Sequence, residues 1–149
     1  MATRSAIGIK LENGDIMAVY CHWDGYPSHN GAILAENYTD PEKIKALISL
    51  GDISSLRPEI GIQHPFDTYY LSEEEKEKYK DMTTYYGRDR DEKGTEYKTF
   101  ENFDAFEEYY DPTGAEYFYL YDQGEWLVCA YGDEFKNLNE VLAADPRHY

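Results

Sequence analysis

The sequence of 149 residues has little cysteine, little positive charge and no long apolar run. Its two cysteines, Cys21 and Cys129, are too few for a disulfide framework, and neither belongs to a Cys-x-x-Cys pair that would bind zinc or perform redox chemistry. No stretch approaches the roughly eighteen apolar residues of a membrane span, and no apolar signal core follows Met1. We therefore expect a cytoplasmic protein with no metal, no other cofactor and no membrane partner.

Positive charge is scarce, because 14 Lys and Arg face 30 Asp and Glu for a formal net charge of −16. A protein that binds nucleic acid neutralises phosphates with basic side chains, so this composition argues against direct binding to DNA or RNA. Hydrophobic residues make up 42% of the chain and aromatic residues 16%, which is enough to form a core. The length and composition predict one domain over residues 1–149.

Two hairpins are the clearest local features of the sequence. Residues 6–12 and 16–23 flank Asn13-Gly14, and residues 116–121 and 126–131 flank the turn 122–125. Hairpins give antiparallel neighbours without long crossovers. We expect an α+β fold, with an antiparallel sheet built from the N-terminal and C-terminal hairpins and about three to four helices packed mainly on one face.

Apolar spacing and capping residues predict where the helices lie. Helices are expected over 28–38, after Asp40 up to Gly51, and over 133–144, with a short helix or turn over 102–110. The segment 60–94 is rich in charge and turn residues, and it is expected to be an irregular or partly mobile insertion.

The densest group of chemically active residues is Tyr20-Cys21-His22-Trp23-Asp24-Gly25-Tyr26-Pro27, at the end of a predicted strand. If the strand continues, His22 and Asp24 point to the same side, where the carboxylate could orient the imidazole as a general base. The alternative is structural, with Gly25 and Pro27 forming a sharp turn and the aromatic rings filling the core beneath it. Cys21 is expected to be a buried free thiol.

A second candidate group is Tyr86-Gly87-Arg88-Asp89-Arg90. Arg88 and Arg90, together with Tyr26 of the first motif, could hold a carboxylate or phosphate group. Ordinary ion pairs with neighbouring carboxylates are the alternative for both arginines.

The third feature is a region without any Lys or Arg, between Lys98 and Lys136. Amphipathic tyrosines such as Tyr109 and Tyr110 lie in the same region, and tyrosine is favoured at protein interfaces. Carboxylates and tyrosines in one region predict a surface that binds basic partners. The alternative is an ordinary acidic surface with the tyrosines buried beneath it. The region contains ten carboxylates: Glu101, Asp104, Glu107, Glu108, Asp111, Glu116, Asp122, Glu125, Asp133 and Glu134.

These motifs resemble a family of small proteins carried by bacteriophages and mobile elements. The resemblance rests on Arg4-Ser5, the motif Tyr20 to Pro27, Gly31, Leu47 and the stretch Leu50-Gly51-Asp52-Ile53-Ser54-Ser55-Leu56, and again on Tyr86 to Arg90. It covers about the first 60 residues well and the acidic, tyrosine-rich C-terminal half only in patches. The resemblance implies an accessory gene of a phage or element, and many such genes inhibit host defence.

Two functions of different classes follow from these observations. The favoured one is an anti-CRISPR or anti-restriction inhibitor that binds a basic nucleic-acid-binding host protein as a DNA mimic, through the carboxylates 101–125 with Tyr109 and Tyr110. The alternative is a ligand-binding module or enzyme that uses His22 and Asp24, with Arg88 and Arg90 holding an anionic substrate. Either protein could be a monomer or a dimer.

Overall fold

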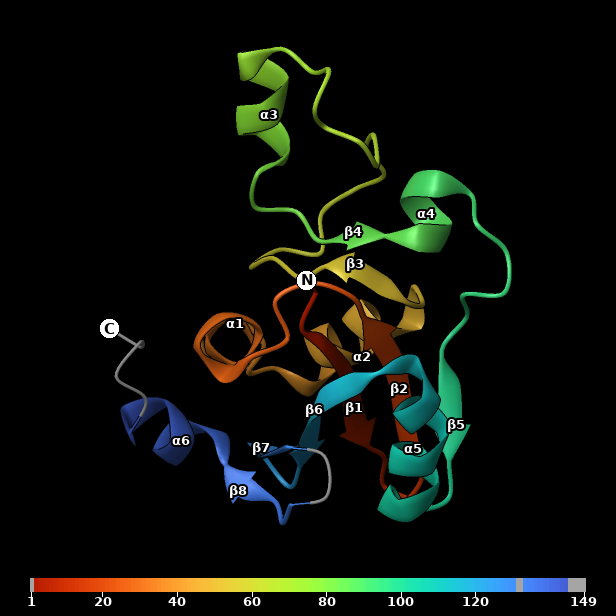
Figure 1. Cartoon of the computed structure of the whole chain (residues 1–149), viewed down its shortest axis with the longest axis vertical. Helices are drawn as coiled ribbons and strands as arrows, with labels where there is room; N and C mark the ends of the chain where they lie inside the picture. The colour runs from red at the N-terminus through yellow and green to blue at the C-terminus, as the bar shows by residue number, and fades with distance from the viewer. Residues whose placement is uncertain (1, 131–132, 145–149) are drawn as a thin grey trace.

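The computed structural model describes residues 2–130 and 133–144. The centre of the fold is a sheet in which both predicted hairpins are present (Figure 1). The first hairpin pairs β1 (Arg4–Lys10) with β2 (Ile16–Cys21), and the second pairs β6 (Ala115–Asp122) with β7 (Glu125–Ala130). In the second turn, Gln123 and Gly124 have φ values of 51° and 85°, which a tight two-residue hairpin turn requires.

The two hairpins join through a parallel pair, since β1 runs alongside β6 in the same direction. A second parallel pair forms where β2 meets β3 (Ile53–Ser55). The prediction of a purely antiparallel sheet was therefore wrong. Local patterns determine strand direction within a hairpin, whereas the long connection from residue 22 to residue 114 sets the direction in which the two hairpins meet. In the part of the chain that is described, the sheet has eight strands in the order β4-β3-β2-β1-β6-β7-β8, with β5 beside β2; the remaining strands are β4 (Thr84–Tyr85), β5 (Lys98–Phe100) and β8 (Lys136–Asn137).

Helices cover both faces of the sheet. On one face, the side chains of Ile7, Val19 and Tyr119 form a buried cluster with residues from three helices. On the other face, α5 packs through Phe106 against Phe118 and its neighbours, and Figure 1 shows α5 in front of β2. The described residues form six α-helices rather than three or four: α1 (Ala32–Asn37), α2 (Pro41–Ser49), α3 (Glu73–Tyr79), α4 (Tyr86–Arg90), α5 (Phe103–Tyr110) and α6 (Leu138–Ala144). Of these, α1, α2 and α6 contribute to the first cluster.

Side-chain caps start three of these helices. The carboxylate of Asp40 accepts the backbone N–H of Glu42 at the start of α2, as the sequence predicted. Ser72 caps α3 and Asn102 caps α5 in the same way. Each cap satisfies a backbone donor that has no partner within the helix, so the first residue of each helix is defined locally.

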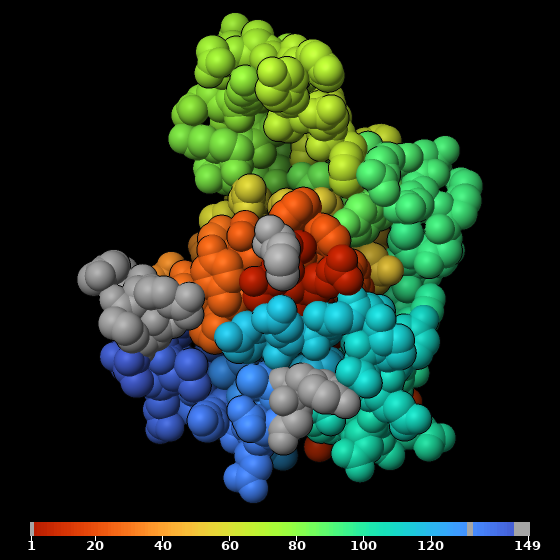
Figure 2. All heavy atoms as spheres, viewed as in Figure 1, coloured from red at the N-terminus to blue at the C-terminus, as the bar shows by residue number. Residues whose placement is uncertain are grey.

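Two segments differ from the prediction. The insertion 60–94 contains α3, β4 and α4 and is more regular than expected, and its part with α3 projects from the body as the yellow-green lobe of Figure 2. The last helix begins at Leu138 rather than Asp133, because Lys136 and Asn137 pair with β7 as β8. Backbone pairing with an existing strand edge competes with helix formation there, and apolar spacing cannot show that competition.

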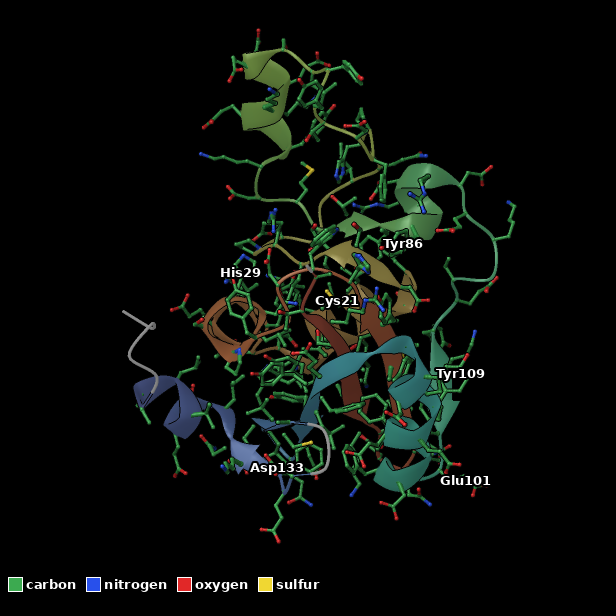
Figure 3. The ribbon with its side chains drawn as sticks, in the orientation of Figure 1. Cys21, His29, Tyr86, Glu101, Tyr109 and Asp133 are labelled. Atoms are coloured by element: carbon green, nitrogen blue, oxygen red, sulfur yellow. The ribbon has the colours of Figure 1, made fainter. Side chains whose placement is uncertain are left out.

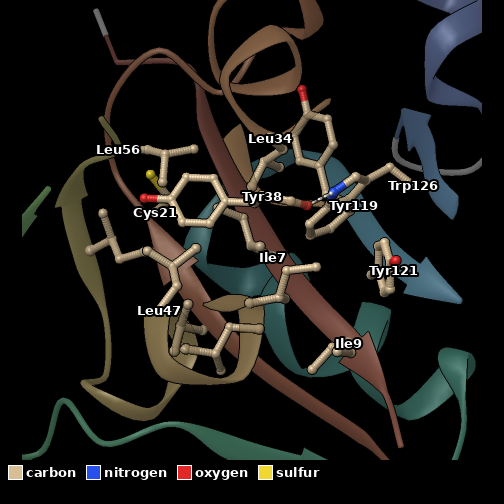
Figure 4. Close-up of a cluster of buried hydrophobic side chains, with 14 of the residues drawn as sticks. Ile7, Ile9, Cys21, Leu34, Tyr38, Leu47, Leu56, Tyr119, Tyr121 and Trp126 are labelled. Carbon is tan, nitrogen blue, oxygen red and sulfur yellow. Dashed lines mark hydrogen bonds between the residues drawn. The ribbon is translucent and has the colours of Figure 1, made fainter. Parts of the chain in front are cut away.

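Aromatic side chains tie the first face of the sheet to its loops. The indole N–H of Trp126 donates to the backbone carbonyl of Tyr38 at 2.8 Å, within the cluster drawn in Figure 4. The hydroxyl of Tyr38 donates to the carbonyl of Arg57, and that of Tyr85 donates to Leu47. A buried Tyr or Trp needs such a partner for its polar atom, so these rings position the loops as well as filling the core.

Candidate functional site

The structure does not bring His22 and Asp24 together as a base and its orienting carboxylate. The strand β2 ends at Cys21, and His22 Nδ1 lies 2.7 Å from the hydroxyl of Tyr20. Asp24 has a left-handed backbone conformation with φ of 57°, and its carboxylate lies 4.0 Å from Nε2 of His29. Burial, together with nearby Arg4, lowers the pKa of His22. The alternating strand geometry on which the prediction depended stops one residue before His22.

The motif forms a corner between β2 and the short helix η1 (Pro27–Gly31). Asn30 is fully buried at this corner, and its amide donates to the Sγ of Cys21 at 3.3 Å and to the carbonyl of Trp23 at 3.1 Å. Its backbone N–H donates to the carbonyl of Asp24. The sharp turn of the structural alternative is therefore present, but its aromatic part was wrong, since Trp23 is 43% exposed and Tyr26 is half-buried rather than filling the core.

The two cysteines are buried free thiols, as predicted for Cys21. Burial is the main cause that raises the pKa of each thiol to about 12. The carboxylates of Glu107 and Asp133 raise the pKa of Cys129 further. Neither thiol is available as a thiolate near neutral pH, which argues against either as a nucleophile.

Arg88 donates its hydrogen bonds to backbone carbonyls and to a neighbouring carboxylate, which leaves none for a ligand. Its guanidinium donates to the carbonyl oxygens of Ile60, Gly61 and Thr83 at 3.0, 3.2 and 2.7 Å, and it also contacts the carboxylate of Asp89. With these donors occupied, the side chain is not free to clamp an anion. The predicted ligand-binding role of Arg88 is replaced by a structural role in anchoring the insertion.

Arg90 and Tyr26 lie in different surroundings. Arg90 stacks over Phe66, with 4.4 Å from its Cζ to the ring centroid, and its Nη2 lies 3.0 Å from a carboxylate oxygen of Glu92. Tyr26 instead lies against the ring of His29 at the motif corner. The anion site predicted from Tyr26, Arg88 and Arg90 is therefore not assembled, although Arg90 lines a cavity described below.

The carboxylates of α5 follow one exposed side of the helix. Asp104, Glu107, Glu108 and Asp111 are three or four residues apart, which places them on the same side, while Phe106 and Tyr110 lie on the buried side. Asp104, Glu108 and Asp111 are exposed and Glu107 is half-buried. We call these four carboxylates the α5 acidic stripe. Figure 3 shows Glu101 and Tyr109 at the outer edge of the same region.

Three further predicted carboxylates, on β6 and β7, lie on the same face of the sheet as α5. Alternate residues of β6 share a face, and Phe118 packs on the α5 side, so Glu116 and Asp122 point to that side. Asp122 is opposite Glu125 on β7. Two of these charges have partners, because Asp122 lies 3.9 Å from Lys10 and Glu125 accepts a hydrogen bond from the Asn137 amide. The carboxylates of α5, β6 and β7 thus lie on the same side of the sheet, and those near the β6–β7 turn are partly compensated.

Most of the tyrosines are not on this surface. Tyr110 is 2% exposed and its hydroxyl donates to the carbonyl of Ala18, so its predicted role as a partner contact was wrong. Tyr119 and Tyr121 are buried on the opposite face of the sheet. Tyr109 is 50% exposed and lies against Phe100, so among the described tyrosines of residues 101–125 it is the exposed one that can meet a partner.

A cavity of about 790 Å³ opens between the body and the projecting insertion. Lys76 and Lys80, from α3 and its C-terminal end, line it together with Arg57, which precedes the insertion, and Arg90 of α4. Sequence reasoning missed this cluster. The spacing of four between Lys76 and Lys80 places them on one side of a helix, but nothing local brings Arg57 to the same place.

Within residues 2–130 and 133–144, no group of three His, Cys, Asp or Glu side chains is arranged to hold a metal ion. No helix in this part of the chain combines the length and apolar character needed to cross a bilayer. Comparisons with protein-family models, with curated proteins and with solved structures found no match.

Proposed function

We propose that this protein is an interaction protein that binds a basic nucleic-acid-binding host protein through its acidic face and excludes nucleic acid from it. The α5 acidic stripe carries the proposal. Residues 104 and 111 are separated by about 10 Å along the helix axis at a rise of about 1.5 Å per residue. Four successive phosphates of one DNA strand span about the same length of duplex axis, at about 3.4 Å each. The stripe therefore has the linear charge density of a DNA strand.

The C-terminal part of the stripe is unfavourable for the helix itself, whereas Asp104 lies in the first turn, where a carboxylate is favourable. A helix C-terminus carries a partial negative charge and is stabilised by cations, but the last turn of α5 contains no basic residue and is followed by Asp111. Carboxylates there cost the fold about 0.3–1 kcal/mol each. A charge pattern that opposes local stability supports a role outside folding.

The chemistry of the acidic face favours a groove lined with Lys and Arg. Complementary potentials accelerate encounter and select cationic partners, and half-exposed Tyr109 adds an aromatic anchor beside the stripe. A groove that binds DNA or RNA has this charge. With the resemblance to phage and mobile-element proteins, the proposed target is a host-defence nucleoprotein of the CRISPR or restriction type.

The test is capture of nucleic-acid-binding proteins from a bacterial host lysate, followed by release with a duplex oligonucleotide. We expect captured proteins to be released by the duplex and by raising the salt concentration from about 50 to about 300 mM, because ion pairs at exposed surfaces are screened. Capture of no nucleic-acid-binding protein, or of proteins that the duplex does not displace, would contradict the proposal.

Reversing the charges of the α5 acidic stripe tests whether this surface binds the captured proteins. The triple variant Asp104→Lys, Glu108→Lys, Asp111→Lys should lose the captured proteins while remaining folded, since two of its changes favour the helix dipole. The matched control Glu36→Lys, Glu74→Lys, Glu140→Lys makes the same change in net charge at exposed positions on α1, α3 and α6. Equal loss in both variants would show an effect of net charge alone and would argue against the stripe as the binding site.

A further inference from the structure

The cavity beneath the insertion has the opposite charge to the rest of the molecule. Four of the 14 basic residues of the chain line it: Arg57, Lys76, Lys80 and Arg90. Asp67 is the one carboxylate in the lining, and its Oδ1 already accepts the backbone N–H of Tyr69. Although the chain has a net charge of −16, these four basic side chains give the cavity a local positive charge that attracts anions.

Three of the four cations of the cavity are only weakly engaged by the protein, whereas Arg90 pairs with Glu92 and stacks over Phe66. Lys76 and Lys80 pair with Glu73 and Glu77 at 3.6 and 2.7 Å, but both pairs are solvent-exposed neighbours on one short helix. Exposed pairs of this kind contribute little and exchange readily with another anion. In the described part of the chain, Arg57 forms no ion pair with a carboxylate, and its Nη1 donates to the carbonyl of Leu56. These side chains are therefore available to a bound anion.

The walls of the cavity also offer flat aromatic surfaces. Trp23 is 43% exposed, and its indole lies edge-on to His22 at 4.7 Å between ring centroids. Tyr79 is stacked on His64 on the side of the insertion. An exposed indole at the mouth of a cationic cavity can stack on a planar group of a ligand whose charged part reaches the arginine and lysines.

We propose that this cavity binds a free nucleotide, with its phosphates held by Arg57, Lys76 and Lys80 and its base against Trp23. The volume lies within the range of about 300–1,000 Å³ that is usual for small-molecule sites. A long nucleic acid would extend beyond the cavity onto a molecule with a net charge of −16, whereas a small ligand can lie within the cavity. This site is independent of the α5 acidic stripe.

The test is isothermal titration calorimetry of the full chain with ADP, with adenosine and with pyrophosphate, at low salt and without divalent cations. We expect ADP to bind more tightly than either pyrophosphate or adenosine, because it alone engages both the cations and the indole. The variant Trp23→Ala should weaken binding of ADP by about tenfold and leave pyrophosphate unchanged within about twofold. Absence of ADP binding to the wild-type chain would overturn the proposal.

Removal of the cations completes the test. The variant Arg57→Gln, Lys80→Gln should weaken both ADP and pyrophosphate by about tenfold or more. The control Lys45→Gln, Lys93→Gln removes two cations that lie outside the cavity lining and should change neither affinity by more than about twofold. If loss of Arg57 disturbs the fold, Lys76→Gln, Lys80→Gln on the exposed α3 makes the same comparison. Equal weakening by the control and the cavity variants would overturn the assignment.

Discussion

Arg88 and Asp89 are neighbours in the chain whose charged groups form a two-pronged ion pair, with Nε to Oδ1 at 3.0 Å and Nη2 to Oδ2 at 3.2 Å. The carboxylate of Asp89 is fully buried and also accepts the backbone N–H groups of His64 and Tyr85. Since Arg88 binds the carbonyls of Ile60 and Thr83, this pair connects α4 to the two ends of the segment 60–83, which contains α3. A buried, fully engaged pair of this kind positions a segment that has few apolar contacts of its own.

Loss of the Asp89 charge should loosen the insertion. In Asp89→Asn, the guanidinium of Arg88 loses its counter-charge at a mostly buried site, and we expect a loss of about 3 kcal/mol of unfolding free energy. Amide hydrogen exchange should accelerate first over residues 57–83. The control Asp91→Asn changes a carboxylate that is 91% exposed, at a left-handed position that Asn tolerates, and should alter stability by less than about 0.5 kcal/mol. Uniform acceleration over the whole sheet would contradict the local role of the pair.

The hydroxyl of Tyr119 should contribute to stability through the motif corner. It donates to the carbonyl of Gly25 at 2.6 Å in a fully buried environment. Tyr119→Phe leaves this carbonyl without that donor and should cost about 1–3 kcal/mol by chemical denaturation. The same change at half-exposed Tyr109 should cost less than about 0.5 kcal/mol. Similar losses at both positions would mean that the buried bond makes no special contribution.

The glycine of the motif is required by close packing. A Cβ at Gly25 would lie 2.8 Å from the Cβ of Ser5 and 2.9 Å from the carbonyl oxygen of Thr3. Gly25→Ala must therefore shift backbone, and we expect a loss of about 2 kcal/mol or more in thermal or denaturant unfolding. At Gly94, a Cβ would meet open space, so Gly94→Asn, which tolerates its positive φ, serves as the control and should be nearly neutral. A stable Gly25→Ala variant would show that the corner is looser than these distances indicate.

Asp52 should make stability depend on pH. Burial raises the pKa of Asp52 to about 6 from its usual 3.8, even though its carboxylate accepts the backbone N–H of Tyr20. Between about pH 4 and pH 6 the folded chain therefore binds more protons at this site than the unfolded chain, so the contribution of Asp52 to stability falls as pH rises through this range. Asp52→Asn keeps an acceptor for Tyr20 and removes the titrating group.

The variant should be more stable than the wild type at about pH 7, by about 1–2 kcal/mol after allowance for solvent screening of the part-exposed group. At about pH 4 the two proteins should unfold at nearly the same temperature. Calorimetric melting at both pH values measures the difference. A stabilisation that is equal at the two pH values would show that the charge of Asp52 is not its source.

Local features of the sequence were sufficient to predict much of the fold. Both hairpins, the Asp40 cap of α2 and the burial of Cys21 follow from turn residues, capping side chains and apolar alternation over a few positions. The acidic character of residues 99–135 is equally a property of composition. The exposed side of α5 follows from helical spacing once Asn102 is recognised as its cap.

The predicted catalytic pair and the predicted anion site required contacts that only the tertiary structure could provide. The structure does not bring their residues together. The imidazole of His22 lies at hydrogen-bonding distance from the hydroxyl of Tyr20, and the guanidinium of Arg88 donates to backbone carbonyls in the insertion. A motif shows which side chains are near one another in sequence, but their partners here come from segments that the motif does not contain. Tyr110 is a similar case, because its burial depends on Ala18, which is 92 positions away.

By itself, the sequence determined both hairpins, the Asp40 cap of α2 and the negative charge of the molecule, because each depends on interactions within a few residues or on composition alone. Only the tertiary structure decided that β1 and β6 run parallel, that Tyr110 is buried and that Arg57 meets Lys76 and Lys80 around one cavity. These relationships join residues far apart in the chain. Such contacts depend on how the helices, strands and loops pack against one another, which no local sequence pattern specifies.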